Sequence, residues 1–278
     1  MTAYATLDIN PTGTTSALGR TIRLRRLFGA TGRTVTVALD QAVPRGVAPR
    51  LAGIAPTYDG IAAAGPDAVT MFKGIAGHVI AHNPTRVPWI LKASTFSVDF
   101  HAHYDAVVAS VSDAIRLGAE AVAVGISAGS SNQARDLELL SGVVESAGAV
   151  GLPVVCHAYP SGELWEDRKG SVEAILYAAR AAAELGVDVV KTWYSGSTES
   201  FREIVEGTPA IVVAAGGAKA DSPLQVLRQA ASVIEAGGRG VTFGRNVWGA
   251  EDPGKMVRAL RAVVHEDVEP EKAAELLK

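Results

Sequence analysis

The chain has 278 residues, of which 48% are hydrophobic, and its formal net charge is −3. This length and composition allow a large buried core, and the slightly acidic charge excludes general affinity for nucleic acids or acidic membranes. The N-terminal stretch is polar, no apolar run reaches the roughly 18 residues of a membrane span, and the single cysteine, Cys156, cannot form an internal disulfide. We therefore expect a cytoplasmic protein whose partners include neither nucleic acid nor membrane.

Short apolar, β-branched runs alternate with longer helical patterns along the chain. Capping residues begin three of the helical segments, at Ser171, Ser222 and Asp252. Glycine precedes several of the apolar runs, where it favours the left-handed end of a helix. The apolar runs predict eight strands, at residues 34–40, 68–73, 87–94, 121–127, 153–159, 188–193, 210–215 and 240–244.

Regular alternation of strands and helices predicts a parallel sheet, and eight such units in about 250 residues favour a (β/α)8 barrel. The competing doubly wound sheet would favour a G-x-G-x-x-G motif after the first strand, but LDQAVPRG stands there. We predict one barrel domain over residues 1–278. In it, residues 1–30 form an N-terminal cap with a helix, and residues 266–278 form a short C-terminal helix.

Side chains at the C-terminal ends of barrel strands line the active site. The seventh and eighth strands run into AAGGAK and FGRN, and glycine-rich turns at these ends suit a phosphate because the backbone can approach it closely. We predict a phosphate site at Gly216, Gly217, Gly244 and Arg245; two ordinary turns with an arginine ion pair are the alternative. The other strand ends carry Asp40, Lys73, Lys92, Ser94, His157, Tyr159 and Lys191.

Lys191 follows the apolar run of its strand, and lysine is rarely buried unless it is paired. At an ordinary pKa only about 4 in 10,000 lysine amines are neutral at pH 7. Desolvation would raise that fraction and let the amine attack a ketone to form a Schiff base. Tyr159 would then supply acid–base help, and Asp40 would orient a hydroxyl or move a proton. The alternative is a structural ion pair between Lys191 and a carboxylate such as Asp40.

Metal chemistry is the competing hypothesis, because His101 and His103 could supply two ligands. No third histidine or cysteine lies at a suggestive spacing, so we predict no metal. Cys156 lies in the middle of a strand and is expected to be a small core residue.

Four segments together, VVKTWYSG, HAYPSG, VAAGGAK and FGRNVW, resemble the archaeal-type class I fructose-bisphosphate aldolases, which are DeoC/LacD-like aldolases. The resemblance extends from GRTIRLRRLF to VVHED. It implies that Lys191 forms the Schiff base, that Tyr159 gives and accepts protons and that Asp40 is the first-strand aspartate. It also implies that the two glycine loops hold the donor phosphate, that no cofactor is needed beyond the lysine imine, and that the chain forms a homo-oligomer.

Within that family, RLRRLF, FKGI and VVHED resemble the synthases that condense aspartate semialdehyde to a heptulosonate. This branch implies that dihydroxyacetone phosphate, or another phosphorylated ketose fragment, is joined to aspartate semialdehyde to give a C7 precursor of an aminohydroxybenzoate. His157 and Lys73 are expected to contact substrate, Lys73 through the acceptor carboxylate unless it forms a structural ion pair. Gln41 and Ala42 depart from the family pattern, and Ser161 replaces an arginine, which fits an acceptor without a second phosphate. A fructose-1,6-bisphosphate aldolase and a sugar-phosphate-binding sensor are the alternatives.

Overall fold

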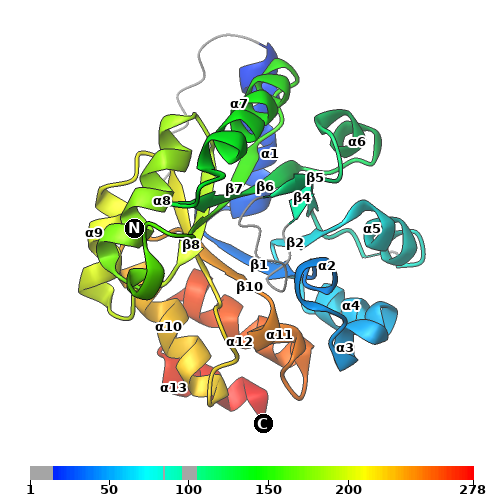
Figure 1. Ribbon diagram of the computed structural model, residues 1–278. Helices are drawn as coiled ribbons and strands as arrows, with labels where there is room; N and C mark the ends of the chain where they lie inside the picture. Colours follow the sequence, from blue (N-terminus) through cyan, green and yellow to red (C-terminus); the bar gives the residue numbers. More distant parts are fainter. Residues whose placement is uncertain (1–14, 84, 96–104) are drawn as a thin grey trace.

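Eight parallel strands close into a barrel that is surrounded by helices in the computed structural model, which describes residues 15–83, 85–95 and 105–278 (Figure 1). The predicted (β/α)8 barrel is therefore confirmed. All eight predicted strands form, with ends within two residues of those expected. In their order around the barrel the strands are β1 (Thr34–Ala38), β10 (Gly240–Phe243), β9 (Ile211–Ala215), β8 (Val189–Trp193), β7 (Val154–Pro160), β6 (Ala121–Ala128), β3 (Trp89–Lys92) and β2 (Ala68–Met71).

Helices follow the strands and cover the outside of the barrel (Figure 1). Short 3₁₀ turns, η1 (Glu166–Arg168) and η2 (Ala274–Leu277), add to them. The α-helices are α1 (Thr15–Phe28), α2 (Ala42–Arg45), α3 (Pro49–Ala52), α4 (Ile54–Ala63), α5 (Lys73–Ile80), α6 (Val111–Arg116), α7 (Gln133–Ala149), α8 (Val172–Glu184), α9 (Thr198–Glu206), α10 (Pro223–Glu235), α11 (Arg245–Trp248), α12 (Pro253–Glu266) and α13 (Pro270–Ala273).

Local signals in the sequence fix the ends of these helices. The side chains of Ser171, Ser222 and Asp252 each accept a hydrogen bond from the backbone N–H three residues later, so all three predicted caps are confirmed. Glycines with positive φ, which cost other residues strain, lie between a helix and the next strand at Gly118, Gly151, Gly186 and Gly237. The chain therefore turns back to the barrel at positions that its sequence already marks.

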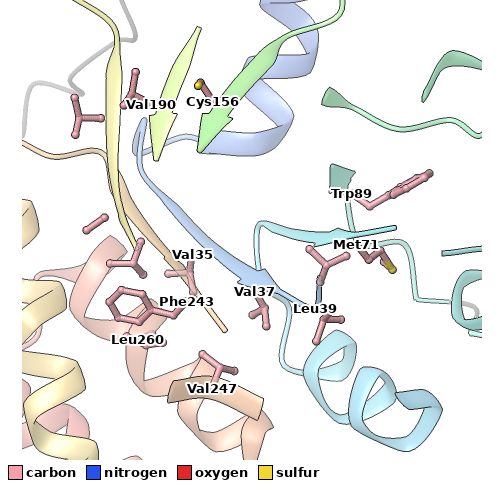
Figure 2. Packing of buried hydrophobic residues seen from close by; sticks show 14 of the residues in the cluster. Val35, Val37, Leu39, Met71, Trp89, Cys156, Val190, Phe243, Val247 and Leu260 are labelled. Carbon is pink, nitrogen blue, oxygen red and sulfur yellow. The ribbon is translucent and has the colours of Figure 1, made fainter. Parts of the chain in front are cut away.

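The largest hydrophobic cluster lies between the barrel wall and the helices. Val35 and Val37 of β1 and Phe243 of β10 pack with Val247 of α11 and Leu260 of α12 (Figure 2). All five side chains are fully buried. Burying a side chain of this size contributes about 1.5–3 kcal/mol, so this layer holds the helices against the sheet.

A second cluster fills the inside of the barrel at the N-terminal ends of its strands. Leu24, Leu27 and Phe28 of α1 pack there against inward-facing side chains such as Ile90 and Val189. Helix α1 therefore closes one end of the barrel, and its apolar residues form a floor beneath the interior.

Arginines on α1 bond the turns that lead into the strands. Arg20 pairs with Asp188 before β8, and Arg26 pairs with Glu120 before β6. Arg23 donates a hydrogen bond to the carbonyl oxygen of Gly151 before β7. These contacts fix α1 across the barrel end.

Two features differ from the expected element pattern. A short antiparallel pair, β4 (Ser94–Thr95) with β5 (Ala106–Val107), lies beside the barrel strands, and strands of two residues are too short to carry a sequence period. The expected C-terminal helix is divided, because α12 ends at Glu266, Asp267 is left-handed, and α13 and η2 follow. None of the helices in the described part of the chain combines the length and apolarity needed to cross a lipid bilayer.

Candidate active site

A cavity of about 530 Å³ opens at the C-terminal ends of the barrel strands. Side chains or loops from both halves of the barrel reach it, as expected for this fold. Eight of the nine site residues predicted from the sequence line it: Asp40, His157, Tyr159, Lys191, Gly216, Gly217, Gly244 and Arg245.

Lys191 lies on β8, in register with His157 of β7 and Val213 of β9. It is 6% exposed, and burial lowers the pKa of its amine to about 8, with Asp40 opposing the change and Lys92 adding to it. At pH 7 about one amine in ten is then neutral, roughly 250 times the fraction at the ordinary pKa. No carboxylate in the described part of the chain forms an ion pair with Lys191. The arrangement therefore favours a nucleophilic amine over a structural ion pair.

Tyr159 lies at the end of β7 and stacks on Trp193 of β8, with ring centroids 5.6 Å apart and planes 25° apart. Burial raises the pKa of its phenol far above the ordinary value, and the Asp40 carboxylate raises it further. The phenol is therefore protonated at neutral pH, and its conjugate base would be strong. Such a group can give a proton and afterwards take one back.

His157 faces the same cavity from β7, two residues before Tyr159. Its Nε2 atom is buried and has no hydrogen-bond partner among the described residues. Burial, together with the charges of Lys191 and Lys92, lowers the pKa of its imidazole well below the ordinary value. The ring is therefore neutral, and its buried Nε2 is left without a hydrogen-bond partner among the described residues.

The loops after β9 and β10, where the phosphate site is predicted, both line the cavity. Gly217 has φ of +64°, and a side chain on Gly216 would bring its Cβ to 3.0 Å from the Phe243 ring. Arg245 Nη2 donates to the carbonyl oxygen of Gly217 at 2.8 Å, and Asn246 Nδ2 donates to that of Gly216 at 2.8 Å. The carbonyl oxygens of Gly217 and Gly216, which would otherwise repel an anion, thus accept hydrogen bonds from side chains of α11.

The charge at this end of the cavity is also suited to an anion. Burial lowers the pKa of the Arg245 guanidinium, and the nearby Arg45 guanidinium lowers it further. Both guanidinium groups line the cavity, and together they attract an anion to this end of it. The sequence indicated Arg245 through its strand end, whereas Arg45 lies on α2 and carried no such signal.

Lys73 is the predicted site residue that does not line the cavity. Strand β2 ends at Met71, two residues earlier than expected, so Lys73 begins α5. Its side chain is 50% exposed, and its Nζ lies 3.5 Å from Asp113 Oδ2. This geometry corresponds to the ion-pair alternative for Lys73.

Two further charged residues, Lys92 and Asp105, line the cavity, and no function is predicted for either from the sequence. Lys92 Nζ lies 3.5 Å from Asp105 Oδ1, and both side chains are at most 5% exposed. Lys92 was recognisable as a strand end. Asp105 lies ten residues after β4, and no sequence pattern connects it with the barrel.

Metal-binding and thiol chemistry find less support in this cavity. Within residues 15–83, 85–95 and 105–278, no three His, Cys, Asp or Glu side chains come together as a metal site. His101 and His103, the two candidate zinc ligands, lie outside the described residues. Cys156 is fully buried in the core beside Val190 (Figure 2), and burial raises the pKa of its thiol, which makes it unreactive.

Comparison with known proteins agrees with this geometry. The DeoC/LacD family of aldolases matches residues 34–250. A 2-amino-3,7-dideoxy-D-threo-hept-6-ulosonate synthase of Halobacterium salinarum is 36% identical over 92% of this chain and 95% of its own length. A 2-amino-4,5-dihydroxy-6-oxo-7-(phosphonooxy)heptanoate synthase of Streptomyces griseus is 31% identical over 88% of this chain and 90% of its own.

A solved structure is similar over the same extent. It is an archaeal fructose-1,6-bisphosphate aldolase whose catalytic lysine is covalently bound to the carbinolamine intermediate of its substrate. That protein is 30% identical, with a TM-score of 0.81 over 88% of this chain and 99% of its own. The barrel, the buried lysine and these relatives lead to one conclusion: the chain belongs to the DeoC/LacD family of aldolases, enzymes that make or break carbon–carbon bonds.

Proposed function

We propose that this protein is a class I aldolase that joins dihydroxyacetone phosphate to an aldehyde, with aspartate semialdehyde as its acceptor. The observation that carries the proposal is the buried amine of Lys191, whose pKa is lowered to about 8 in a cavity that also holds Tyr159 and Asp40. The product would be a C7 amino-keto sugar phosphate, a precursor of an aminohydroxybenzoate. The heptulosonate and phosphonooxyheptanoate synthases among the relatives support this choice of product.

The donor would bind first, with its phosphate at the loops of Gly216, Gly217 and Gly244 beside Arg245. The neutral amine of Lys191 attacks the ketone carbon and gives a carbinolamine, while Asp40 helps to move the amine proton to the ketone oxygen. The Tyr159 phenol then protonates the departing hydroxyl, so water leaves and an iminium forms.

The tyrosinate left by this step is a strong base, because the surroundings of Tyr159 disfavour its charge. It removes a proton from the donor carbon next to the iminium, which yields an enamine and restores the phenol. The enamine carbon attacks the aldehyde, the aldehyde oxygen takes up a proton, and the new bond regenerates an iminium on Lys191. Addition of water to that iminium gives back one proton and releases the product and the free amine.

Two residues on the acceptor side of the cavity favour different acceptors. Ser161 lines the cavity without a charge, which suits an aldehyde that has no second phosphate. Lys169 also lines the cavity, and a lysine there favours a phosphorylated acceptor. With the similarity to an archaeal fructose-1,6-bisphosphate aldolase, this makes cleavage of the bisphosphate the second candidate function.

Borohydride trapping tests the proposal directly. The protein is incubated with dihydroxyacetone phosphate, reduced, digested and mapped by mass spectrometry, with K191M and the distant surface variant K255M as matched controls. We expect an adduct on Lys191 in the wild type and in K255M, and none in K191M. Binding of the phosphate ester without any adduct would refute the proposal and support a binding barrel.

A second measurement identifies the acceptor. Condensation with aspartate semialdehyde is compared with cleavage of fructose 1,6-bisphosphate under the same conditions. If condensation is the faster reaction, aspartate semialdehyde is supported as the acceptor. If cleavage is faster, glyceraldehyde 3-phosphate would be the acceptor instead.

A further inference from the structure

A buried ion pair lies across the cavity from the phosphate site. Strand β3, which carries Lys92, is four positions from β9 in the ring of eight strands. Lys92 lines the cavity and is 4% exposed. Its Nζ lies 3.2 Å from Ser94 Oγ and 3.5 Å from Asp105 Oδ1. Such a pair costs desolvation energy and is weak evidence for stability by itself, which is consistent with a functional role.

The fold holds Asp105 firmly in place. Ser94 Oγ donates to Asp105 Oδ1 at 2.6 Å, and the backbone N–H of Asp105 donates to Asp136 Oδ1 at 3.1 Å. Gly125 leaves the room for this carboxylate, since a Cβ there would lie 2.5 Å from both of its oxygens. Gly125 is in register with His157, and His157 with Lys191. The Asp105 carboxylate therefore fills the space that a side chain at position 125 would take. That position is level with His157 and Lys191 on the neighbouring strands.

Polar groups on this wall have unused hydrogen-bonding capacity. An ammonium carries three N–H donors, and Lys92 has two partners among the described residues, one of them at a long 3.5 Å. His157 also lines the cavity, and its buried Nε2 has no hydrogen-bond partner among the described residues. Buried polar atoms are nearly always bonded, so this wall is suited to a polar ligand atom.

The donor in the proposed reaction would extend from the loops after β9 and β10 to Lys191 on β8. That leaves the wall formed by β3, β6 and β7 for the acceptor. Resting on the proposed function, we propose that Lys92 is a catalytic residue whose ammonium binds the oxygen of the acceptor aldehyde and protonates it as the carbon–carbon bond forms, with His157 as a further contact to the acceptor.

The charges of this step balance. The enamine on Lys191 uses its electron pair to form the new bond and becomes an iminium, while the carbonyl pair moves onto the aldehyde oxygen. That oxygen takes a proton from Lys92, which becomes a neutral amine. Water then adds to the iminium, and the proton released by this addition returns to Lys92. During carbon–carbon bond formation one positive charge thus moves from Lys92 to the imine of Lys191.

The experiment separates donor chemistry from acceptor chemistry. In D2O with dihydroxyacetone phosphate alone, NMR measures deuterium exchange at the donor carbon, which requires the imine and proton removal but no acceptor. Condensation with aspartate semialdehyde, and with glyceraldehyde 3-phosphate, is measured separately. Both are measured well above the pKa of Lys191, so that a change in that pKa does not obscure the result. The proteins are the wild type, K92M and the surface control K255M.

We expect K92M to retain exchange within about threefold and to lose about 100- to 1,000-fold in kcat/KM for either aldehyde, which is the loss typical of removing one donor to a developing oxyanion. K255M should match the wild type. Condensation by K92M at the wild-type rate would overturn the inference. So would equal loss of exchange and condensation, which would show that Lys92 acts on the donor or on the fold.

Two controls keep the result decisive. If K92M does not fold because Asp105 is left buried and unpaired, the double variant K92M/D105N removes that charge and is measured in its place, with the same expected split. If the wild type shows neither exchange nor an adduct, the proposed function fails rather than the role of Lys92. If the wild type is active and K92M is equally active, the role of Lys92 is refuted and the proposed function stands.

Discussion

The titration of Lys191 is the most direct consequence of its burial. Its pKa of about 8 means that the neutral fraction of the amine is about 9% at pH 7 and about 90% at pH 9. The rate of imine formation should therefore rise about tenfold between these two pH values and level off above them. A lysine at the ordinary value would show a rise of about a hundredfold and no plateau in this range.

Substitution of Asp40 provides a second, independent test of this prediction. It stabilises the ammonium form of Lys191 and so opposes the effect of burial. D40N removes the negative charge, and the midpoint of the profile should move to lower pH. The midpoint is compared rather than the maximal rate, because D40N also removes a group proposed to move protons.

The assay is borohydride trapping at saturating dihydroxyacetone phosphate, with the adduct on Lys191 quantified by mass spectrometry at each pH. A hundredfold rise from pH 7 to 9 would refute the lowered pKa of Lys191, and an upward shift of the midpoint in D40N would refute the stabilisation of its ammonium form by Asp40. A tenfold rise with a downward shift would establish that desolvation, rather than an ion pair, governs the reactivity of Lys191.

Other changes test the energetics of the same cavity. K191M should raise the free energy of unfolding at pH 7 by up to about 3 kcal/mol, as measured by denaturant titration. The pKa of Lys191 is lower in the folded than in the unfolded protein, so its ammonium destabilises the fold most below pH 8. The gain from K191M should therefore shrink between pH 8 and 10.5. Y159F should slow trapping about 10²- to 10⁴-fold while calorimetry shows the phosphate ester still bound. R245Q should raise the dihydroxyacetone phosphate concentration for half-maximal trapping about 10- to 100-fold, as expected on losing charged hydrogen bonds. G125A should cost about 1–3 kcal/mol in unfolding free energy because its Cβ meets Asp105, whereas G74A, with open space around it, should be neutral or stabilising.

Much of the barrel could be predicted from the sequence because its signals are local. Caps such as Ser171 and turns such as Gly186 act on the next few residues, and apolar strands separated by such signals can form only a few topologies. The position of Lys191 at the end of one strand was enough to place it in the cavity. The glycine loops after β9 and β10 were found in the same way.

The remaining parts of the site depend on distant contacts or on small shifts of an element end. A difference of two residues in the end of β2 moves Lys73 from the cavity to an exposed ion pair with Asp113. Asp105 reaches the cavity only because Gly125, on another strand, leaves space for it. A lone glycine in an apolar strand signals that something approaches closely, but the sequence does not say which residue does so.

The unusual pKa of Lys191 depends on the construction of the whole barrel interior. Inward-facing side chains alternate along each strand, so Val189 lies one inward step below Lys191, and Ile90 lies one step below Lys92. Both apolar side chains belong to the cluster that α1 closes from beneath. With that floor sealed, water can reach the amine of Lys191 from the open end alone, and desolvation is accordingly the largest cause of its lowered pKa. The helix that closes the barrel therefore prepares the amine at its other end, without contacting it.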